Sequence, residues 1–149
     1  MKPLLLILLT SLVFACKMEC NLCFTPPDNF AFKIVDKSTE ENLLNLDLYK
    51  QDTIDLYYFE NSERKDVNIE IVRNHYNELI LQSNQLGWIA STGASEFYLY
   101  LNYSDTDTIN LDVRELSDRC CTWFETHFFS INNQFPEYDW DEYVYLIKK

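Results

Sequence analysis

Glycine and proline are scarce in this chain, with two and four residues respectively among 149. Collagen-like, linker-like and low-complexity sequences depend on one or both of these residues and are therefore excluded. Disorder is excluded as well, because 47% of the residues are hydrophobic and 15% are aromatic, which is enough for a buried core. The length fits one ordinary domain.

Basic residues are also few, since 12 Lys and Arg stand against 24 Asp and Glu, for a formal net charge of -12. A nucleic-acid-binding protein needs Lys and Arg to neutralise phosphates. A protein that docks on anionic lipid through its surface charge needs a basic patch. We therefore expect no nucleic-acid partner and no basic lipid-binding patch.

Motifs of catalysis are absent from the sequence. It contains no Gly-x-Ser-x-Gly elbow, phosphate-binding glycine loop, His-Glu-x-x-His motif or dinucleotide fingerprint. His75 and His127 are isolated and lack the partners of a catalytic base. Acids gather at Asp105-x-Asp107 and at residues 137–142, where we expect solvated turns, with a calcium site as the alternative. We predict no enzymatic activity, no cofactor and no metal.

The first residues have the pattern of an export signal. A short basic start precedes residues 4–14, which are nearly all apolar. About eleven residues are too few to span a bilayer, which takes about twenty, but they suit the apolar region of a secretory signal. The run ends in Val-Phe-Ala-Cys at positions 13–16.

Positions 13–16 resemble the lipobox of bacterial lipoproteins, in which a lipid is attached to the cysteine sulfur and cleavage leaves that cysteine first. The resemblance implies that residues 1–15 are a signal peptide and that Cys16 carries the lipid. Ordinary secretory cleavage, which would leave Cys16 as a free thiol, is the alternative. Lipidation of Cys16 would leave an even set of four of the five cysteines, as an exported protein favours.

A lipid on Cys16 implies a place in the cell envelope, because several acyl chains hold a protein firmly on a bilayer. Lys17 stands where an aspartate would resemble an inner-membrane retention signal, and Lys17-x-Glu19 loosely resembles a sequence that directs lipoproteins to the outer surface. We expect the outer membrane, with its side left open. Residues 16–29 would be the lipidated N-terminus and tether, and residues 30–149 a single β domain.

The remaining cysteines form two pairs, Cys20-x-x-Cys23 and the adjacent Cys120-Cys121. Disulfides are favoured over a zinc site because the envelope is oxidising and because adjacent strand residues point to opposite faces, where they seldom bind one ion. We expect bridges between the two pairs, which would fasten the tether to a late strand. Free thiols are an alternative, and the connectivity stays open.

Apolar residues alternate along most of the mature chain, as where Val67, Ile69 and Ile71 are separated by polar residues. Such alternation is typical of half-buried strands. Strands are expected at residues 30–34, 54–58, 67–71, 79–81, 97–103, 109–113, 123–129 and 143–147. Residues 39–44 suggest one turn of helix at most. This spacing predicts an all-β antiparallel sandwich, loosely immunoglobulin-like, with a small β-barrel as the alternative.

Aromatic residues are abundant, with ten Phe, ten Tyr and three Trp. At a surface, Tyr and Trp suit the recognition of sugars or proteins, because each has an apolar body and a polar group. The candidate ligand-binding residues are Tyr138, Trp140, Tyr143 and Tyr145, with packing in the core and at sheet edges as the alternative. We expect a non-enzymatic binding or structural module for a glycan or an envelope protein. A barrel-type carrier of a small apolar ligand is the second hypothesis.

A short sequence occurs twice, as Asp-Thr-Ile-Asp-Leu at 52–56 and Asp-Thr-Ile-Asn-Leu at 107–111. It indicates either a shared way of opening a strand or a duplicated half-domain. It also resembles the Asp-Ser/Thr-apolar sequence that some bacteria O-glycosylate after export, which would place sugars on Thr53 and Thr108.

Lipidation predicts a defined product. We expect the mature protein in the membrane fraction, with an intact mass equal to residues 16–149 plus lipid, because the acyl chains retain it there. A further mass increment would indicate sugars on Thr53 or Thr108, and a mass of polypeptide plus lipid alone would exclude them. A soluble product with an unmodified Cys16 thiol would contradict the lipobox interpretation.

Overall fold

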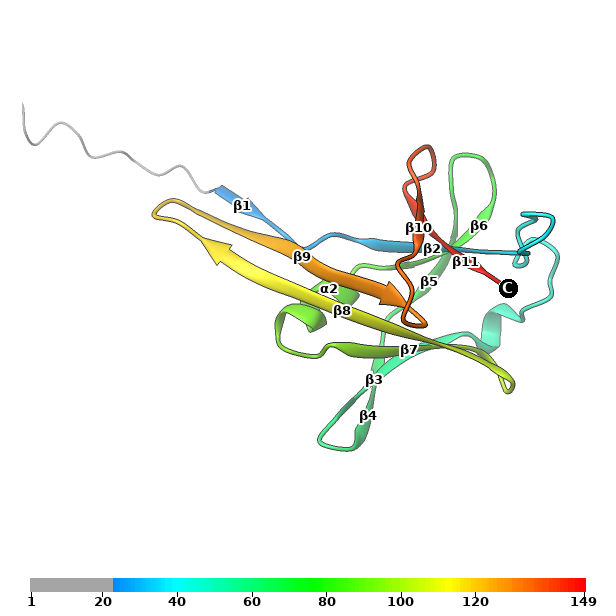
Figure 1. Ribbon diagram of the computed structural model, residues 1–149, viewed down its shortest axis with the longest axis horizontal. Coiled ribbons are helices and arrows are strands. Elements are labelled where there is room, and N and C mark those ends of the chain that lie inside the picture. The colour runs from blue at the N-terminus through cyan, green and yellow to red at the C-terminus, as the bar shows by residue number, and fades with distance from the viewer. Residues whose placement is uncertain (1–22) are drawn as a thin grey trace, which may run out of the picture.

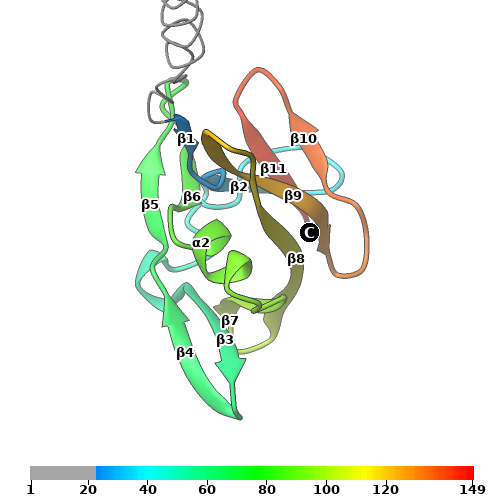
Figure 2. The ribbon, with the colours of Figure 1, turned by 90° about the vertical axis from the view of Figure 1, so that its left-hand side faces the viewer.

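Two β-sheets packed face to face form the protein, in a computed structural model that describes residues 23–149 (Figure 1 and Figure 2). The first sheet contains, in spatial order, β1 (Cys23–Thr25), β9 (Cys121–Ile131), β8 (Asp105–Ser117), β7 (Glu96–Asn102), β3 (Asp55–Glu60) and β4 (Glu63–Val67). The second contains β10 (Glu137–Asp139), β11 (Val144–Lys148), β2 (Phe30–Val35), β6 (Leu79–Ser83) and β5 (Glu70–Arg73). The expected all-β sandwich is confirmed, and the sheets do not close into a barrel.

Both sheets are mixed rather than wholly antiparallel. Most neighbouring strands are antiparallel, but β1 runs parallel to β9 and β2 runs parallel to β11. Each parallel pair joins a strand near the start of the described chain to one far along the sequence, which leaves room for the long connection that parallel pairing requires. The alternation of apolar and polar residues indicates which side chains lie on each face of a strand. It does not indicate whether the neighbouring strand is parallel or antiparallel.

Every expected strand is present, although one is divided. The strand predicted at 67–71 is the end of β4 and the start of β5, because the chain crosses here from the first sheet to the second. The alternating pattern continues from one sheet to the other, because Val67 and Ile69 both pack in the core between the sheets. A turn at Asn61-Ser62 joins β3 to β4, and both residues have positive φ, as in a two-residue type I′ hairpin.

Helices are short in this fold. Residues 39–44 form turns without a helix, and a 3-10 turn, η1, spans Gln51–Thr53. The α-helix α2 (Leu86–Ser91) was not predicted, because six residues are too few to reveal a helical period. Gly87 lets α2 pack closely on the segment before β2, since a Cβ there would lie 2.8 Å from the Cβ of Pro27.

Strand β2 is buried on both faces. Phe32 and Ile34 belong to the main core between the sheets. Ala31 packs in a smaller cluster with Ile80 and Val144. Lys33 is only 8% exposed. Its ammonium group therefore needs oppositely charged partners within the fold.

A second ammonium group, that of Lys149, lies between two carboxylates. Its Nζ is 2.6 Å from Asp105 Oδ1 and 2.7 Å from both carboxylate oxygens of Asp107. Tyr49 donates a hydrogen bond to Asp105 at 2.7 Å, and Asn132 donates one to Asp107 at 2.6 Å. Burial, followed by the bond to Asp105, raises the pKa of Tyr49. The expectation of solvated turn acids is wrong for Asp107, which is buried within β8 because Lys149 neutralises it.

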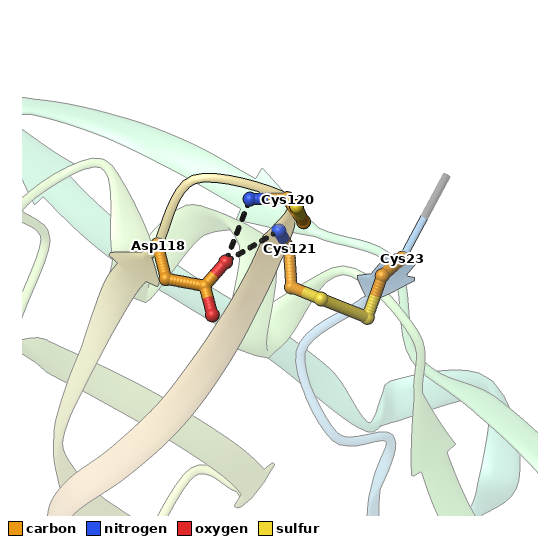
Figure 3. The surroundings of a disulfide bond; sticks show 4 residues. All are labelled: Cys23, Asp118, Cys120 and Cys121. Atoms are coloured by element: carbon orange, nitrogen blue, oxygen red, sulfur yellow. Dashed lines mark hydrogen bonds between the residues drawn. A yellow bond between two sulfur atoms is a disulfide. The ribbon is translucent and has the colours of Figure 1, made fainter. Parts of the chain in front are cut away.

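A disulfide joins Cys23 of β1 to Cys121 of β9 across the parallel pair (Figure 3). It confirms the expected bridging between the two cysteine pairs. Cys120 is also disulfide-bonded, and Cys20 lies outside the described residues. Asp118 shapes the turn before β9, because its carboxylate accepts hydrogen bonds from the N–H groups of Cys120 and Cys121 at 2.8 and 2.7 Å. These bonds lower the pKa of Asp118.

The sheet structure begins earlier than the boundary expected at residue 30. Residues 23–25, assigned above to the tether, form β1 at the edge of the first sheet. Pro26-Pro27 then follow, and the chain continues into β2 of the second sheet. The disulfide and the pairing with β9 hold β1 in place. A strand of three residues is too short to show an alternating pattern in the sequence, so it was not predicted.

Reduction of the disulfides is expected to destabilise the domain. The Cys23–Cys121 bridge closes a loop with a sequence separation of 98, and in the chain-entropy model a loop of that size raises the free energy of the unfolded chain by about 4.7 kcal/mol. Urea unfolding of the oxidised protein and of the reduced, alkylated protein would measure the difference. Equal free energies of unfolding would show that the bridges leave the unfolded chain unconstrained.

Candidate functional site

The β10–β11 hairpin brings three of the four predicted aromatic residues together. Tyr138 and Tyr145 are register partners, and their ring centroids are 4.7 Å apart. Trp140 contacts Tyr138 edge to face at 4.8 Å. Tyr145 continues inward to Phe129, 4.5 Å away. This aromatic group is therefore exposed at Trp140, and Tyr145 anchors it in the core. Burial raises the pKa of Tyr145, so its hydroxyl stays protonated.

The tip of this hairpin holds two aromatic side chains in solvent. Trp140 is 76% exposed and Tyr143 is 70% exposed. Tyr143 also has a φ of 58°, in the left-handed region that favours Gly or Asn. A bulky residue there costs about 1 kcal/mol or more. Packing in the core does not account for Tyr143, because its ring lies largely in water.

A second loop, residues 74–78 between β5 and β6, lies beside the hairpin, and Figure 1 shows the two loops projecting from the same side. Asn74 joins them by donating a hydrogen bond to Glu142 at 2.6 Å. Between them is a hollow of about 330 Å³, at the small end of the range for ligand pockets. Its lining consists of Tyr76, Glu78, Asp139, Asp141 and Glu142.

Tyr76 extends the predicted aromatic group, and sequence reasoning did not find it. Its ring is exposed and lies 3.8 Å from the ring of His75, centroid to centroid. Both residues stand in the turn between β5 and β6. Tertiary contacts, among them the hydrogen bond from Asn74 to Glu142, bring this turn to the hairpin, so an isolated sequence carries no signal for it.

Lys33 lies beneath the hollow and holds both loops. Its Nζ is 2.7 Å from Glu142 Oε1 and also forms an ion pair with Glu78. Burial lowers the pKa of Lys33, but the hydrogen bonds to Glu142 and Glu78 together raise it by more than burial lowers it. The net shift of the pKa is therefore upward, and the ammonium group stays charged. One cation thus neutralises two of the four carboxylates that line the hollow.

The turn between β10 and β11 is shaped by Asp139. Its carboxylate accepts hydrogen bonds from the N–H groups of Asp141 and Glu142 at 2.9 and 3.1 Å. The turn sets Trp140 between two residues that line the hollow. Carboxylates accept hydrogen bonds from hydroxyl groups, and aromatic faces stack on apolar C–H surfaces. Within residues 23–149, no group of three His, Cys, Asp or Glu residues is arranged to hold a metal ion.

The remaining predicted residues lie elsewhere. Thr53 ends η1, and its hydroxyl donates to the carbonyl of Lys50 at 2.8 Å. Thr108 lies within β8, where its N–H donates to Asn132 at 2.9 Å. The repeated sequence therefore opens a strand only at its first copy, and a shared entry device is wrong for the second. Cys16 lies outside the described residues.

Comparison with other proteins adds no relative. No protein-family model matches the chain, and neither the curated proteins nor the solved structures yield a match. From Cys23 to Lys149 there is no helix with the length and apolar character needed to cross a membrane.

Replacement of Lys33 is expected to destabilise the protein and loosen the site. Lys33→Met leaves Glu142 and Glu78 without their cation, at a cost of about 3 kcal/mol. The matched control is Lys65→Met, which removes an exposed pair with Glu63 and should cost less than about 1 kcal/mol. Urea unfolding of the three proteins would measure both changes. Equal effects of the two substitutions would contradict the role assigned to Lys33.

Proposed function

We propose that this protein is a lipid-anchored module of the bacterial cell envelope, attached to the outer membrane through Cys16, that binds a glycan without enzymatic activity. The resemblance of positions 13–16 to a lipobox supports the anchor. The binding surface would be the β10–β11 hairpin together with the neighbouring 74–78 loop.

The exposed rings of Trp140 and Tyr143 beside a hollow lined by carboxylates are the observation that supports glycan binding. A sugar ring presents apolar C–H groups on its faces and hydroxyl groups around its edge. Trp140 and Tyr76 offer faces for the former, and Asp141 offers an acceptor for the latter. The hairpin is rigid, because Tyr145 and Glu142 fix it to the body of the domain.

The carrier hypothesis receives less support from the fold. A carrier needs an interior cavity, whereas Phe32, Leu81 and Phe97 are completely buried between the two sheets. The sandwich is open at its edges instead of closing around a ligand. A filled core with aromatic side chains on the outside fits a module that binds at its surface.

Titration with oligosaccharides from peptidoglycan and from outer-membrane polysaccharide, followed by isothermal calorimetry, would test the proposal. We expect one of these classes to bind, and Trp140→Ala to weaken that binding about tenfold or more, as for a central aromatic contact. Tyr103→Ala is the matched control, because Tyr103 is the most exposed aromatic residue outside the site. It should leave the dissociation constant unchanged.

Tyr143→Asn separates binding from folding in the same assay. Asn suits the left-handed backbone, so the variant should be at least as stable as the wild type in urea unfolding. It should nevertheless bind the oligosaccharide more weakly, since the exposed ring is lost. Absence of binding by both classes of oligosaccharide, or equal losses with Trp140→Ala and Tyr103→Ala, would refute a glycan site here.

A further inference from the structure

Three aromatic residues form a partly exposed cluster where α2 meets β1 and β9, which we name the β1–α2 aromatic cluster. Trp88 of α2 stacks on Phe24 of β1, with ring centroids 6.1 Å apart, and contacts Phe124 of β9 edge to face at 5.0 Å. Phe24 is 57% exposed and Trp88 is 41% exposed. The stacking holds the rings in place but leaves much of their apolar surface in water.

Charged side chains are missing from the segments that carry two of these rings. Residues 79–95, which include α2, contain no Asp, Glu, Lys, Arg or His, and neither do residues 20–27, which include β1. Elsewhere the chain is rich in charge, with 24% charged residues and a net charge of -12. Two stretches without charge that carry the exposed rings of Phe24 and Trp88 on so acidic a protein suit a position against a lipid interface, where Trp and Phe are favoured and carboxylates are not.

The chain before β1 limits how far this cluster can lie from a lipid on Cys16. Only residues 17–22 separate Cys16 from Cys23, and a chain of that length spans at most about 25 Å when fully extended. Cys23 is fixed to β9 by the disulfide, and Phe24 is the next residue. The cluster is therefore held near the bilayer by covalent geometry.

The position of β1 in the molecule agrees with this constraint. Figure 1 shows β1 toward one end of the longest axis, beside the tip of the β8–β9 hairpin, and Figure 2 looks onto that end, where α2 also lies. The hairpin β10–β11 lies farther along the axis in Figure 1. An anchor that pulls on β1 would thus bring this end, and not the candidate glycan site, to the membrane.

We propose that the β1–α2 aromatic cluster rests in the interface of the bilayer that holds the anchor, and so sets the orientation of the domain. This inference rests on the proposed lipid at Cys16. The partner of the cluster is a surface of zwitterionic lipid, which has no net charge, because anionic headgroups repel the acidic protein. The candidate glycan site would then be held away from the membrane, accessible to its ligand.

Quenching of tryptophan fluorescence by brominated lipid tests this contact. The full-length lipidated protein would be reconstituted in vesicles of phosphatidylethanolamine and phosphatidylcholine, with or without bromine on the acyl chains. In Trp123→Phe/Trp140→Phe the remaining tryptophan is Trp88, and its emission should fall about twofold in brominated vesicles, as for a side chain at the interface. In Trp88→Phe/Trp123→Phe the remaining Trp140 should keep its emission.

The intact mass of the same sample distinguishes the two proposals. A protein that carries lipid on Cys16 but whose Trp88 is not quenched would overturn the membrane contact and leave the anchor standing. A protein without the lipid would overturn the anchor and the contact together. Emission from Trp88 that changes with protein concentration and not with bromine would assign the cluster to a second copy of the chain and would equally overturn the proposal.

Discussion

The neutralisation of Lys33 inside the second sheet is the interaction on which the candidate site depends. Strand β2 supplies much of the core, and its position leaves the ammonium group of Lys33 with little access to water. Glu78 and Glu142 come from two loops far apart in sequence, and both must reach this one cation. The loops are therefore fixed side by side, and the aromatic side chains that they carry are presented on a rigid base. The same ion pairs that stabilise the fold thus position the surface proposed to bind a ligand.

The domain has two ends with different chemistry. Near β1, the Cys23–Cys121 disulfide ties the start of the described chain to the β8–β9 hairpin, beside the exposed rings of Phe24 and Trp88. Farther along the longest axis of the domain, the exposed rings of Trp140 and Tyr76 lie beside the carboxylates of the hollow. The anchored binding module proposed here would use this difference, because one end would face the bilayer and the other would meet a ligand. In the proposed orientation, the carboxylates of the hollow would face the ligand, and the uncharged helix α2 would face the bilayer.

Strand positions were predictable because alternation of apolar residues is a local property. Val67, Ile69 and Ile71 show it even where the chain changes sheets, so the pattern placed a strand correctly but could not show that it divides. The proximity of Tyr138 and Tyr145 was predictable, because a hairpin brings residues near in sequence together. Tyr76 was not found, since its approach to the hairpin depends on Asn74 and Glu142, which are 68 positions apart. The burial of Asp107 was missed for the same reason, because its partner Lys149 is distant in sequence.

By itself the sequence determined the class of the fold, most strand positions, the acidic character and the excess of aromatic residues, because each follows from composition or from a period of two residues. Only the tertiary structure decided which strands pair in parallel, which cysteine joins Cys23, which carboxylates are neutralised and which aromatic rings remain in solvent. Those features depend on contacts between residues far apart along the chain. Such contacts form only when the two sheets pack and bury their shared core.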